Sequence, residues 1–265
     1  MKTNHLFKCV RALLLCVNIS FSQDSVVAGN RIDLTVIPAV QSDQGGFVYS
    51  YDLMNGPNTE QEVYRFWVLA PKGVTISNLK APEGWRVSFG PLGDSLSAEW
   101  GAWFNNVPPK SSLGGSFHAG SLPTIVPLYA EGWHPLPETE EEPLPGYYDL
   151  APFGPGVAGK TVGPGLPLDG LQSLTLLDTL RAIMAEARTL GWIGTQAAEE
   201  KYIAYLDQAR MRLQAGDSSG AKAPLEAMLE SVPQDTVAGL TIEACLLLRL
   251  NTEYLPGTPP RKGKH

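Results

Sequence analysis

The stretch FVYSYDL, residues 47–53, decides the fold of the amino-terminal half of the chain. Its apolar and polar residues alternate with a period of two, so the aromatic residues and Leu53 lie on one face of an extended segment. The turn signal Asn55-Gly56-Pro57 follows directly. The pattern predicts a half-buried β-strand that ends in a tight turn.

Similar short runs lie on both sides of this stretch, between residues 30 and about 133. One begins at Ile32 and continues through Val36, with Pro38 expected to end it. Residues 63–69 form a more continuous apolar run, which is typical of a strand covered on both faces. About seven short strands with no helical period between them predict an antiparallel β-sandwich. The remaining strands are expected at residues 74–76, 85–89, 96–100 and 124–129.

The hydrophobic period becomes helical after Leu171, and four short helices are expected to form a small antiparallel four-helix bundle. Gly191 is placed as the C-cap of the first helix, and Thr241 as the N-cap of the fourth. Pro224 would cost about 3 kcal/mol in a helix interior, so the third helix is expected to start late or to kink. The four inward faces are Leu177, Leu180, Met184 and Ala187; Tyr202, Tyr205, Leu206, Ala209 and Leu213; Leu225, Met228, Leu229 and Val232; and Ala244, Leu247, Leu248, Asn251 and Leu255.

Residues 1–22 have the pattern of a bacterial signal peptide. Three basic residues precede a short apolar run, residues 12–17, and small residues fit cleavage before Gln23. The run is shorter than the about 20 residues that span a bilayer, so no transmembrane segment is expected in the mature chain. Lipid attachment at Cys16 is an alternative, but Leu15 stands where a small residue is usual. We expect an exported protein, either periplasmic or extracellular.

Net charge and cysteines narrow the classes of partner. Loss of the signal peptide removes three cations and no anions, which changes the formal charge from −7 to −10. An acidic chain of this kind is not expected to bind nucleic acid. The remaining cysteine, Cys245, lies in an apolar helical run and is expected to be a small buried hydrophobe rather than a nucleophile.

These patterns divide the chain into segments. The sandwich is expected to end near residue 133 or to continue to about residue 165, because Lys160-Thr161-Val162 between glycines fits a last edge strand. The intervening stretch is rich in proline and glycine and is interpreted as an acidic loop or linker. The expected order is a signal peptide at 1–22, the sandwich at 23–133, the loop or linker at 134–170, the helical domain at 171–256 and a basic tail at 257–265.

Two family resemblances rest on short motifs. The helical third of the chain resembles the FIMAH domain family of secreted bacterial proteins, which implies a non-catalytic interaction module without known binding residues; Pro224 departs from that family's helical pattern. The β region resembles an immunoglobulin-like type of exported bacterial proteins, which implies an immunoglobulin-like β-sandwich before the four-helix bundle. The helical likeness is carried by Leu190-Gly191-Trp192-Ile193, Leu206-Asp207-Gln208-Ala209, Gly216-Asp217, Ala221, Leu225, Leu240-Thr241 and Glu243-Ala244, and the other by Tyr49-Ser50-Tyr51, Asn55-Gly56, Ala81-Pro82-Glu83-Gly84-Trp85 and Gly159-Lys160-Thr161-Val162-Gly163-Pro164.

No enzyme motif stands out in the sequence. Nucleophile-elbow, zinc-protease, Walker and dinucleotide-binding patterns are absent. His118 and His134 lack the spacing of zinc ligands. A glycosidase needs two carboxylates at a fixed separation, and Glu99 beside Trp100 has no evident partner. We therefore expect a non-catalytic protein, and a site that gathers Glu99, His118 and a second carboxylate would contradict this.

Two ligand classes remain as alternatives to a protein partner at the cell surface. Trp85 and Trp100 alternate as core positions, which leaves Trp103 and Trp133 as exposed aromatic side chains able to stack on a carbohydrate. Calcium is a weaker alternative, because the acidic cluster lacks the ligand spacing of calcium loops, and no other cofactor is expected. The acidic cluster consists of Glu138, Glu140, Glu141 and Glu142.

Overall fold

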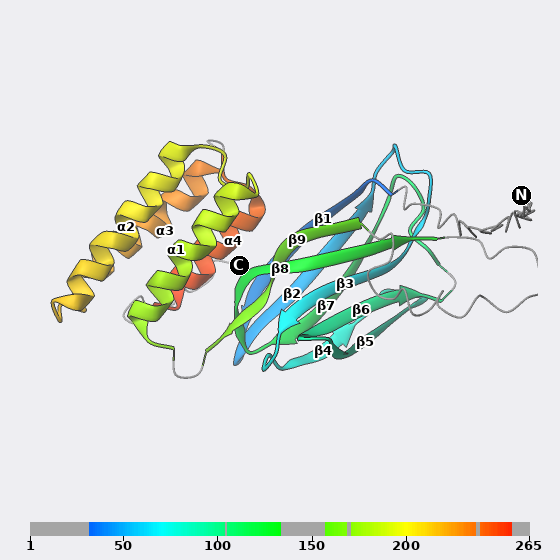
Figure 1. Ribbon diagram of the computed structural model, residues 1–265, viewed down its shortest axis with the longest axis horizontal. Coiled ribbons are helices and arrows are strands. Elements are labelled where there is room, and N and C mark those ends of the chain that lie inside the picture. The colour runs from blue at the N-terminus through cyan, green and yellow to red at the C-terminus, as the bar shows by residue number, and fades with distance from the viewer. Residues whose placement is uncertain (1–31, 104, 134–156, 169–170, 237–238, 256–265) are drawn as a thin grey trace, which may run out of the picture.

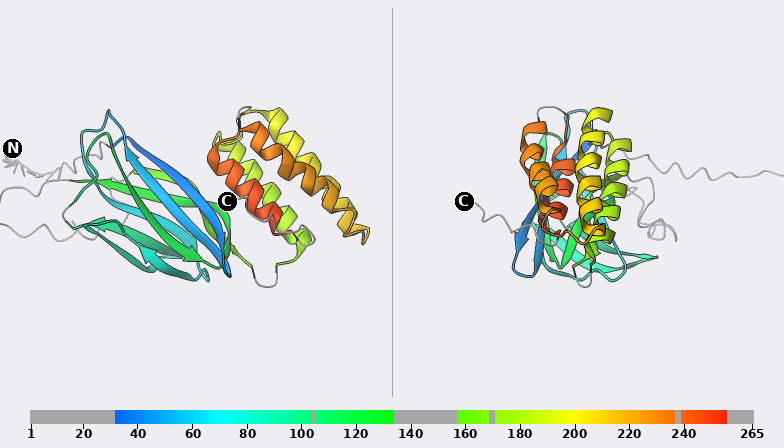
Figure 2. Two further views of the ribbon diagram at one scale, coloured as in Figure 1. Left: turned by 180° about the vertical axis from the view of Figure 1, so that it is seen from behind. Right: turned by 90° about the vertical axis from the view of Figure 1, so that its left-hand side faces the viewer.

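The computed structural model describes residues 32–103, 105–133, 157–168, 171–236 and 239–255. Within these residues, nine strands form two facing sheets, and four helices follow at one edge of the sheets (Figure 1). Views from behind and from the side show the same arrangement (Figure 2). The expected signal peptide, acidic cluster and basic tail lie outside the described residues.

Both sheets are antiparallel throughout, which confirms the predicted β-sandwich architecture. The four-stranded sheet contains, in spatial order, β1 (Leu34–Asp43), β2 (Gly46–Asn55), β7 (Ser111–Ala119) and β4 (Ile76–Lys80). The five-stranded sheet contains β5 (Trp85–Leu92), β6 (Ser95–Ala102), β3 (Val63–Pro71), β8 (Ser121–Gly132) and β9 (Val157–Pro167).

Aromatic residues of β2 fill the space between the sheets. Phe47, Tyr49 and Tyr51 are at most 1% exposed, as their alternation predicts. The Tyr49 hydroxyl donates to the Ser121 carbonyl at 2.7 Å, and the Tyr51 hydroxyl donates to the Val162 carbonyl at 3.0 Å. Burial raises the pKa of both phenols, so they stay protonated and act as hydrogen-bond donors that join the two sheets.

Strand β7 lies inside the four-stranded sheet, where the sequence pattern predicts no strand. Its sequence, SSLGGSFHA, is rich in serine and glycine, which are poor strand formers. Core packing requires a glycine at position 115, because a Cβ there would lie 2.6 Å from Nε1 of Trp100. Trp100 reaches across from β6 and donates that N–H to the Lys80 carbonyl at 3.0 Å. The glycine therefore makes room for the largest side chain of the core.

One local prediction about a strand is corrected, and one alternative left open by the sequence is decided. Pro38 does not end the first strand but lies within β1, opposite Tyr51. A proline is tolerated there because β1 is an edge strand, so its missing N–H can face away from the sheet. The sandwich continues past residue 133, because β9 pairs with β8 along most of its length, and Lys160-Thr161-Val162 lies in this edge strand, as one of the two alternatives predicts. Residues 134–156 therefore connect two strands of the same sheet, and residues 168–172 join the sandwich to the helices.

The helical region contains α1 (Ser173–Thr189), α2 (Gln196–Gln214), α3 (Lys222–Asp235) and α4 (Ile242–Glu253). The C-cap of α1 is Leu190, one residue before the predicted C-cap, and Gly191, with φ of +76°, directly follows it. Pro224 falls in the first turn of α3, where its missing N–H has no helical partner in any case. The inward faces predicted for the first, third and fourth helices are buried, whereas Tyr205 and Leu213 of α2 are only partly buried.

Helix caps follow the predictions only in part. Thr241 occupies the N-cap position of α4, but its side chain makes no capping hydrogen bond, and its buried Oγ1 has no partner among the described residues. At the start of α2, by contrast, the N-cap residue Thr195 does form the capping bond, because its Oγ1 accepts from the Ala198 N–H at 3.2 Å. The Thr241 N–H donates to the Trp192 carbonyl at 2.9 Å, which ties the start of α4 to the connection after α1.

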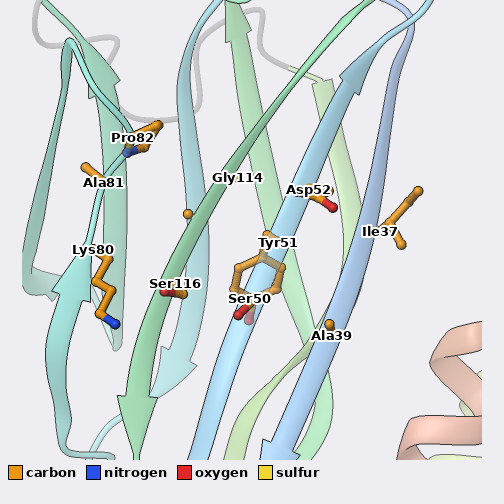
Figure 3. A pocket seen from close by; sticks show the side chains of 11 residues that line it. Ile37, Ala39, Ser50, Tyr51, Asp52, Lys80, Ala81, Pro82, Gly114 and Ser116 are labelled. Atoms are coloured by element: carbon orange, nitrogen blue, oxygen red, sulfur yellow. The ribbon is translucent and has the colours of Figure 1, made fainter.

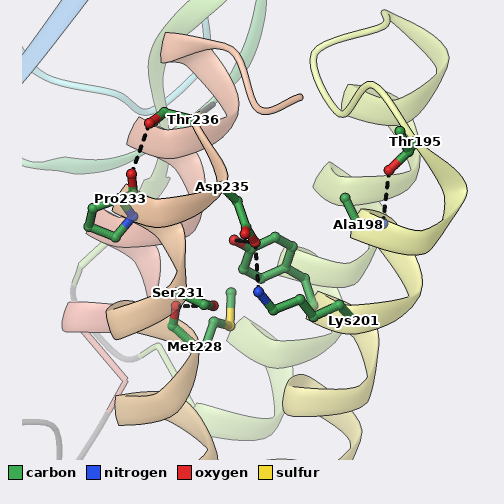
Figure 4. Close-up of polar contacts among 9 residues, drawn as sticks. Thr195, Ala198, Lys201, Met228, Ser231, Pro233, Asp235 and Thr236 are labelled. Carbon is green, nitrogen blue, oxygen red and sulfur yellow. Dashed lines mark hydrogen bonds and ion pairs between the residues drawn. The ribbon is translucent and has the colours of Figure 1, made fainter. Parts of the chain in front are cut away.

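A polar cluster joins α2 to the end of α3 (Figure 4). Asp235 accepts hydrogen bonds from Lys201 Nζ at 2.8 Å and from the Tyr202 hydroxyl at 2.6 Å. Burial alone would raise the pKa of Asp235, but these hydrogen bonds and the Lys201 charge outweigh it and lower that pKa below its ordinary value. The carboxylate thus stays charged and holds the two helices together.

The helices pack directly on the sandwich, with α1 and α4 against it and α2 and α3 on the far side (Figure 1). Asn251 of α4 is fully buried and donates from Nδ2 to the Pro123 carbonyl of β8 at 2.9 Å. Tyr254 packs on Phe47, with ring centroids 5.1 Å apart. Buried residues of the sandwich and of the helices form one continuous hydrophobic cluster.

Candidate functional site

Two exposed tryptophans lie at the same end of the five-stranded sheet. Trp103 directly follows β6 and is 56% exposed, and Trp133 directly follows β8 and is 44% exposed. Both strands pair with β3, and Arg65 of β3 lies opposite Gly101 on one side and Glu131 on the other. The two strand ends are therefore level, about 10 Å apart across two strand spacings.

Neighbouring groups hold both tryptophans in place. The backbone N–H of Trp103 donates to the Gly84 carbonyl at 2.9 Å, and the guanidinium carbon of Arg86 lies 3.5 Å from the centroid of the Trp103 ring. The backbone N–H of Trp133 donates to the Glu62 carbonyl at 2.6 Å. Tyr64 meets the Trp133 ring edge-on, with centroids 5.6 Å apart and an interplanar angle of 83°. The strand ends and the neighbouring Arg86 and Tyr64 side chains thus pre-orient the rings, which reduces the entropy lost on binding.

Charged side chains lie on β3 and its neighbours between these strand ends. The Nε of Arg65 is 3.4 Å from Glu99 Oε1, and its Nη1 is 4.0 Å from Glu131 Oε2. All three side chains remain partly exposed. The guanidinium carbon of Arg65 also lies 5.7 Å from the ring centroid of Trp67. We call the surface made by Trp103, Arg86, Arg65, Glu99, Glu131 and Trp133 the aromatic end.

Among the described residues, the structure places a second carboxylate, Glu131, near Glu99 through their shared partner Arg65, but it does not bring His118 to them. Glu99 pairs with Arg65 on the outer face of the five-stranded sheet, whereas His118 alternates out of β7 on the other sheet, 3.5 Å from Ser77 Oγ. Burial raises the pKa of the Cys245 thiol, which keeps it protonated and a poor nucleophile. Within the described ranges, no three His, Cys, Asp or Glu side chains lie close enough to hold a metal ion.

The site residues predicted from the sequence have different outcomes. Trp103 and Trp133 are exposed, as the sequence predicts, and the strand order brings them to one sheet end. The proposed calcium ligands Glu138, Glu140, Glu141 and Glu142 lie outside the described residues. Arg65 and Arg86 are not among the site residues predicted from the sequence. Each lies next to a buried aromatic residue of its strand, Phe66 or Trp85, so the alternation of the strand indicates that both arginines point outward. No helix in the part of the chain described here has the length and apolarity of a membrane span.

Two solved structures show a weak likeness to parts of the chain. No protein-family model and no curated protein matches the chain. One similar solved structure is the chitin-binding domain of Chi18aC from Streptomyces coelicolor, with 22% identity over 32% of this chain and 78% of that chain and a TM-score of 0.23. Another is a cohesin module from a Clostridium perfringens family 33 glycoside hydrolase, with 8% identity over 52% of this chain and 98% of that chain and a TM-score of 0.29. At these TM-scores, neither likeness bears on the ligand of this chain.

Proposed function

We propose that this protein is an exported, non-catalytic binding protein whose sandwich binds a glycan at the aromatic end. The observation that carries this proposal is that Trp103 and Trp133 are both exposed at one end of the same sheet. Flat aromatic faces cover the apolar faces of sugar rings, and polar groups beside them orient the hydroxyls. Two platforms about 10 Å apart suit a chain of sugars better than a single ring.

The neighbouring charges support a glycan ligand. The guanidinium of Arg65 and the carboxylates of Glu99 and Glu131 supply donors and acceptors close together. Such mixed groups suit hydroxyls, each of which donates and accepts. Arg65 already forms ion pairs with both carboxylates. An uncharged ligand such as a neutral sugar can therefore bind beside these groups.

Export and the two family resemblances complete the proposal. The amino-terminal pattern supports export, and the short motifs support an immunoglobulin-like sandwich followed by a FIMAH-like four-helix bundle. In this arrangement the helical region stabilises the sandwich through α4, while the aromatic end lies at the opposite end of the sheets (Figure 1). Sequencing of the amino terminus of the protein recovered outside the cytoplasm tests cleavage before Gln23.

A retention assay on insoluble β-glucan, chitin and peptidoglycan tests the glycan proposal. Loss of one tryptophan face removes roughly 60 Å² of contact, about a third of what such a side chain can bury. At about 25 cal/mol per Å² this corresponds to roughly a tenfold weaker Kd. Trp103→Ala and Trp133→Ala should each weaken retention by that factor, and the double variant should abolish it.

Met211→Ala is the matched control, because this side chain is 61% exposed on α2, far from the aromatic end. Its variant should be retained like the unmodified protein. Retention of the double tryptophan variant at the unmodified level would refute a glycan site at the aromatic end. Failure of the unmodified protein to bind any of the three polymers would refute it for these glycan classes.

A further inference from the structure

A hollow lies on the outer face of the four-stranded sheet, on the opposite side of the sandwich from the aromatic end's sheet. Its volume is about 280 Å³, and its floor is formed by small residues of three adjacent strands. Ala39 of β1, Ser50 of β2 and Ser116 of β7 stand side by side in the sheet register. Such small side chains let another chain approach the sheet closely.

No core side chain requires a glycine at position 114, whereas Trp100 requires one at the neighbouring position 115. It is exposed and lies opposite Asp52 in the register. A Cβ at Gly114 would lie 2.9 Å from Asp52 Oδ1, so the glycine leaves the space that this carboxylate occupies above β7. The glycine thus lets the Asp52 carboxylate lie over β7, at the side of the hollow.

Irregular pairing at β4 forms the other wall of the hollow. The register between β4 and β7 shifts between Ser77 and Lys80, and Asn78 has a positive φ of 50°. Lys80 then lies opposite Ser116, at the edge of the sheet. Ala81 and Pro82 continue the wall beyond the strand.

Two opposite charges flank the floor. Figure 3 shows Lys80 on one side and Asp52 on the other, with Ser50 and Ser116 between them. The register places the two charged residues two strands and two residues apart, which is about 12 Å between their Cα atoms. In the part of the chain that the structure describes, neither side chain has a hydrogen-bond or ion-pair partner. The charges are therefore available to a ligand.

We infer that this hollow binds an extended polypeptide segment carrying a basic and an acidic side chain four residues apart. In an extended chain, residues i and i+4 point to the same side and lie about 13 Å apart, which matches the separation of Asp52 and Lys80. The Ser50 and Ser116 hydroxyls face the middle of such a segment. Two full charges and no exposed aromatic platform favour a peptide over a glycan here.

Panning of random 12-residue peptides on the purified chain tests the inference. The unmodified protein should enrich peptides with a base and an acid four positions apart, in one order along the peptide. The double reversal Asp52→Lys with Lys80→Asp should enrich the opposite order. Single neutral variants, Asp52→Asn or Lys80→Gln, should weaken a selected peptide about two- to fivefold, as expected for exposed ion pairs.

An exposed ion pair elsewhere provides the control. Lys72, just after β3, and Asp94, in the turn between β5 and β6, form an ion pair on the other sheet with Nζ and Oδ1 2.8 Å apart. Reversal of both charges, Lys72→Asp with Asp94→Lys, preserves that pair. This control variant should enrich the same peptides as the unmodified protein. Absence of enrichment, or the same peptides from the unmodified protein and the Asp52–Lys80 reversal, would overturn the inference. Binding of a glycan that only the Asp52–Lys80 reversal abolishes would also overturn it, because the hollow would then be a sugar site.

Discussion

A single methyl group at Gly115 should destabilise the sandwich, and the contacts give the magnitude. The Cβ of Gly115→Ala would lie 2.6 Å from Nε1 and 2.9 Å from Cε2 of Trp100. The Trp100 ring is 1% exposed and stacks on Phe117 at 5.9 Å, so it has little room to move. Overpacking costs about 1–3 kcal/mol, and a displaced Nε1 loses its bond to Lys80, worth about 1 kcal/mol. Alanine recovers about 0.5–1 kcal/mol of backbone entropy. The net loss should be about 1–3 kcal/mol.

Urea denaturation, followed by tryptophan fluorescence and circular dichroism, measures this loss as a lower transition midpoint. Gly90→Ala on β5 is the matched control, because no atom lies within 4 Å of its added Cβ. That variant should be unchanged or up to about 1 kcal/mol more stable.

A double-mutant cycle separates the clash from a general cost of alanine. Trp100→Phe removes the Nε1 that Gly115→Ala would strike, so the two changes together should cost less than the sum of each alone. Equal stability of Gly115→Ala and Gly90→Ala would refute the reasoning, as would strict additivity of the two substitutions.

Three further predictions concern the helices, and each is checked by denaturation. Thr195→Ala removes an N-cap hydrogen bond and should cost about 1 kcal/mol, whereas Thr241→Ala should cost clearly less because that hydroxyl makes no capping bond. Asp235 has a lowered pKa in the folded state, so its stabilisation is present above the unfolded value of 3.8 and is lost as pH falls through the folded pKa; Asp235→Asn should lower stability at neutral pH and flatten the acid limb. Asn251→Ala leaves a buried β8 carbonyl without its donor and should cost about 2–3 kcal/mol.

Most of the fold follows from hydrophobic period alone. The strand of residues 47–53 and the helix around Leu177 were both predictable, because each buries one face and the alternation or helical period records it. Strand β7 was not predictable, because its serines and glycines are poor strand formers and the need for Gly115 comes from Trp100 on another strand. A single sequence contains no sign of that distant partner.

The aromatic end also combines features that the sequence predicts with features that depend on distant strands. Exposure of Trp103 and Trp133 could be predicted, since both fall just outside the alternating runs. Their position at one end of one sheet could not, because it depends on β3 lying between β6 and β8. The hollow on the other sheet depends on a register shift in β4, which local sequence does not record.

The contact of α4 with β1, β8 and β9 has a consequence for how separate copies of the chain meet. An open sandwich has strands at its borders whose unpaired N–H and C=O groups can recruit strands from another molecule. Here α4 lies against the border formed by β1 and β9, and the opposite border is interrupted by Asn78 in β4 and Pro91 in β5. The helical region thus covers one border of the sandwich, where a strand from another molecule could otherwise pair.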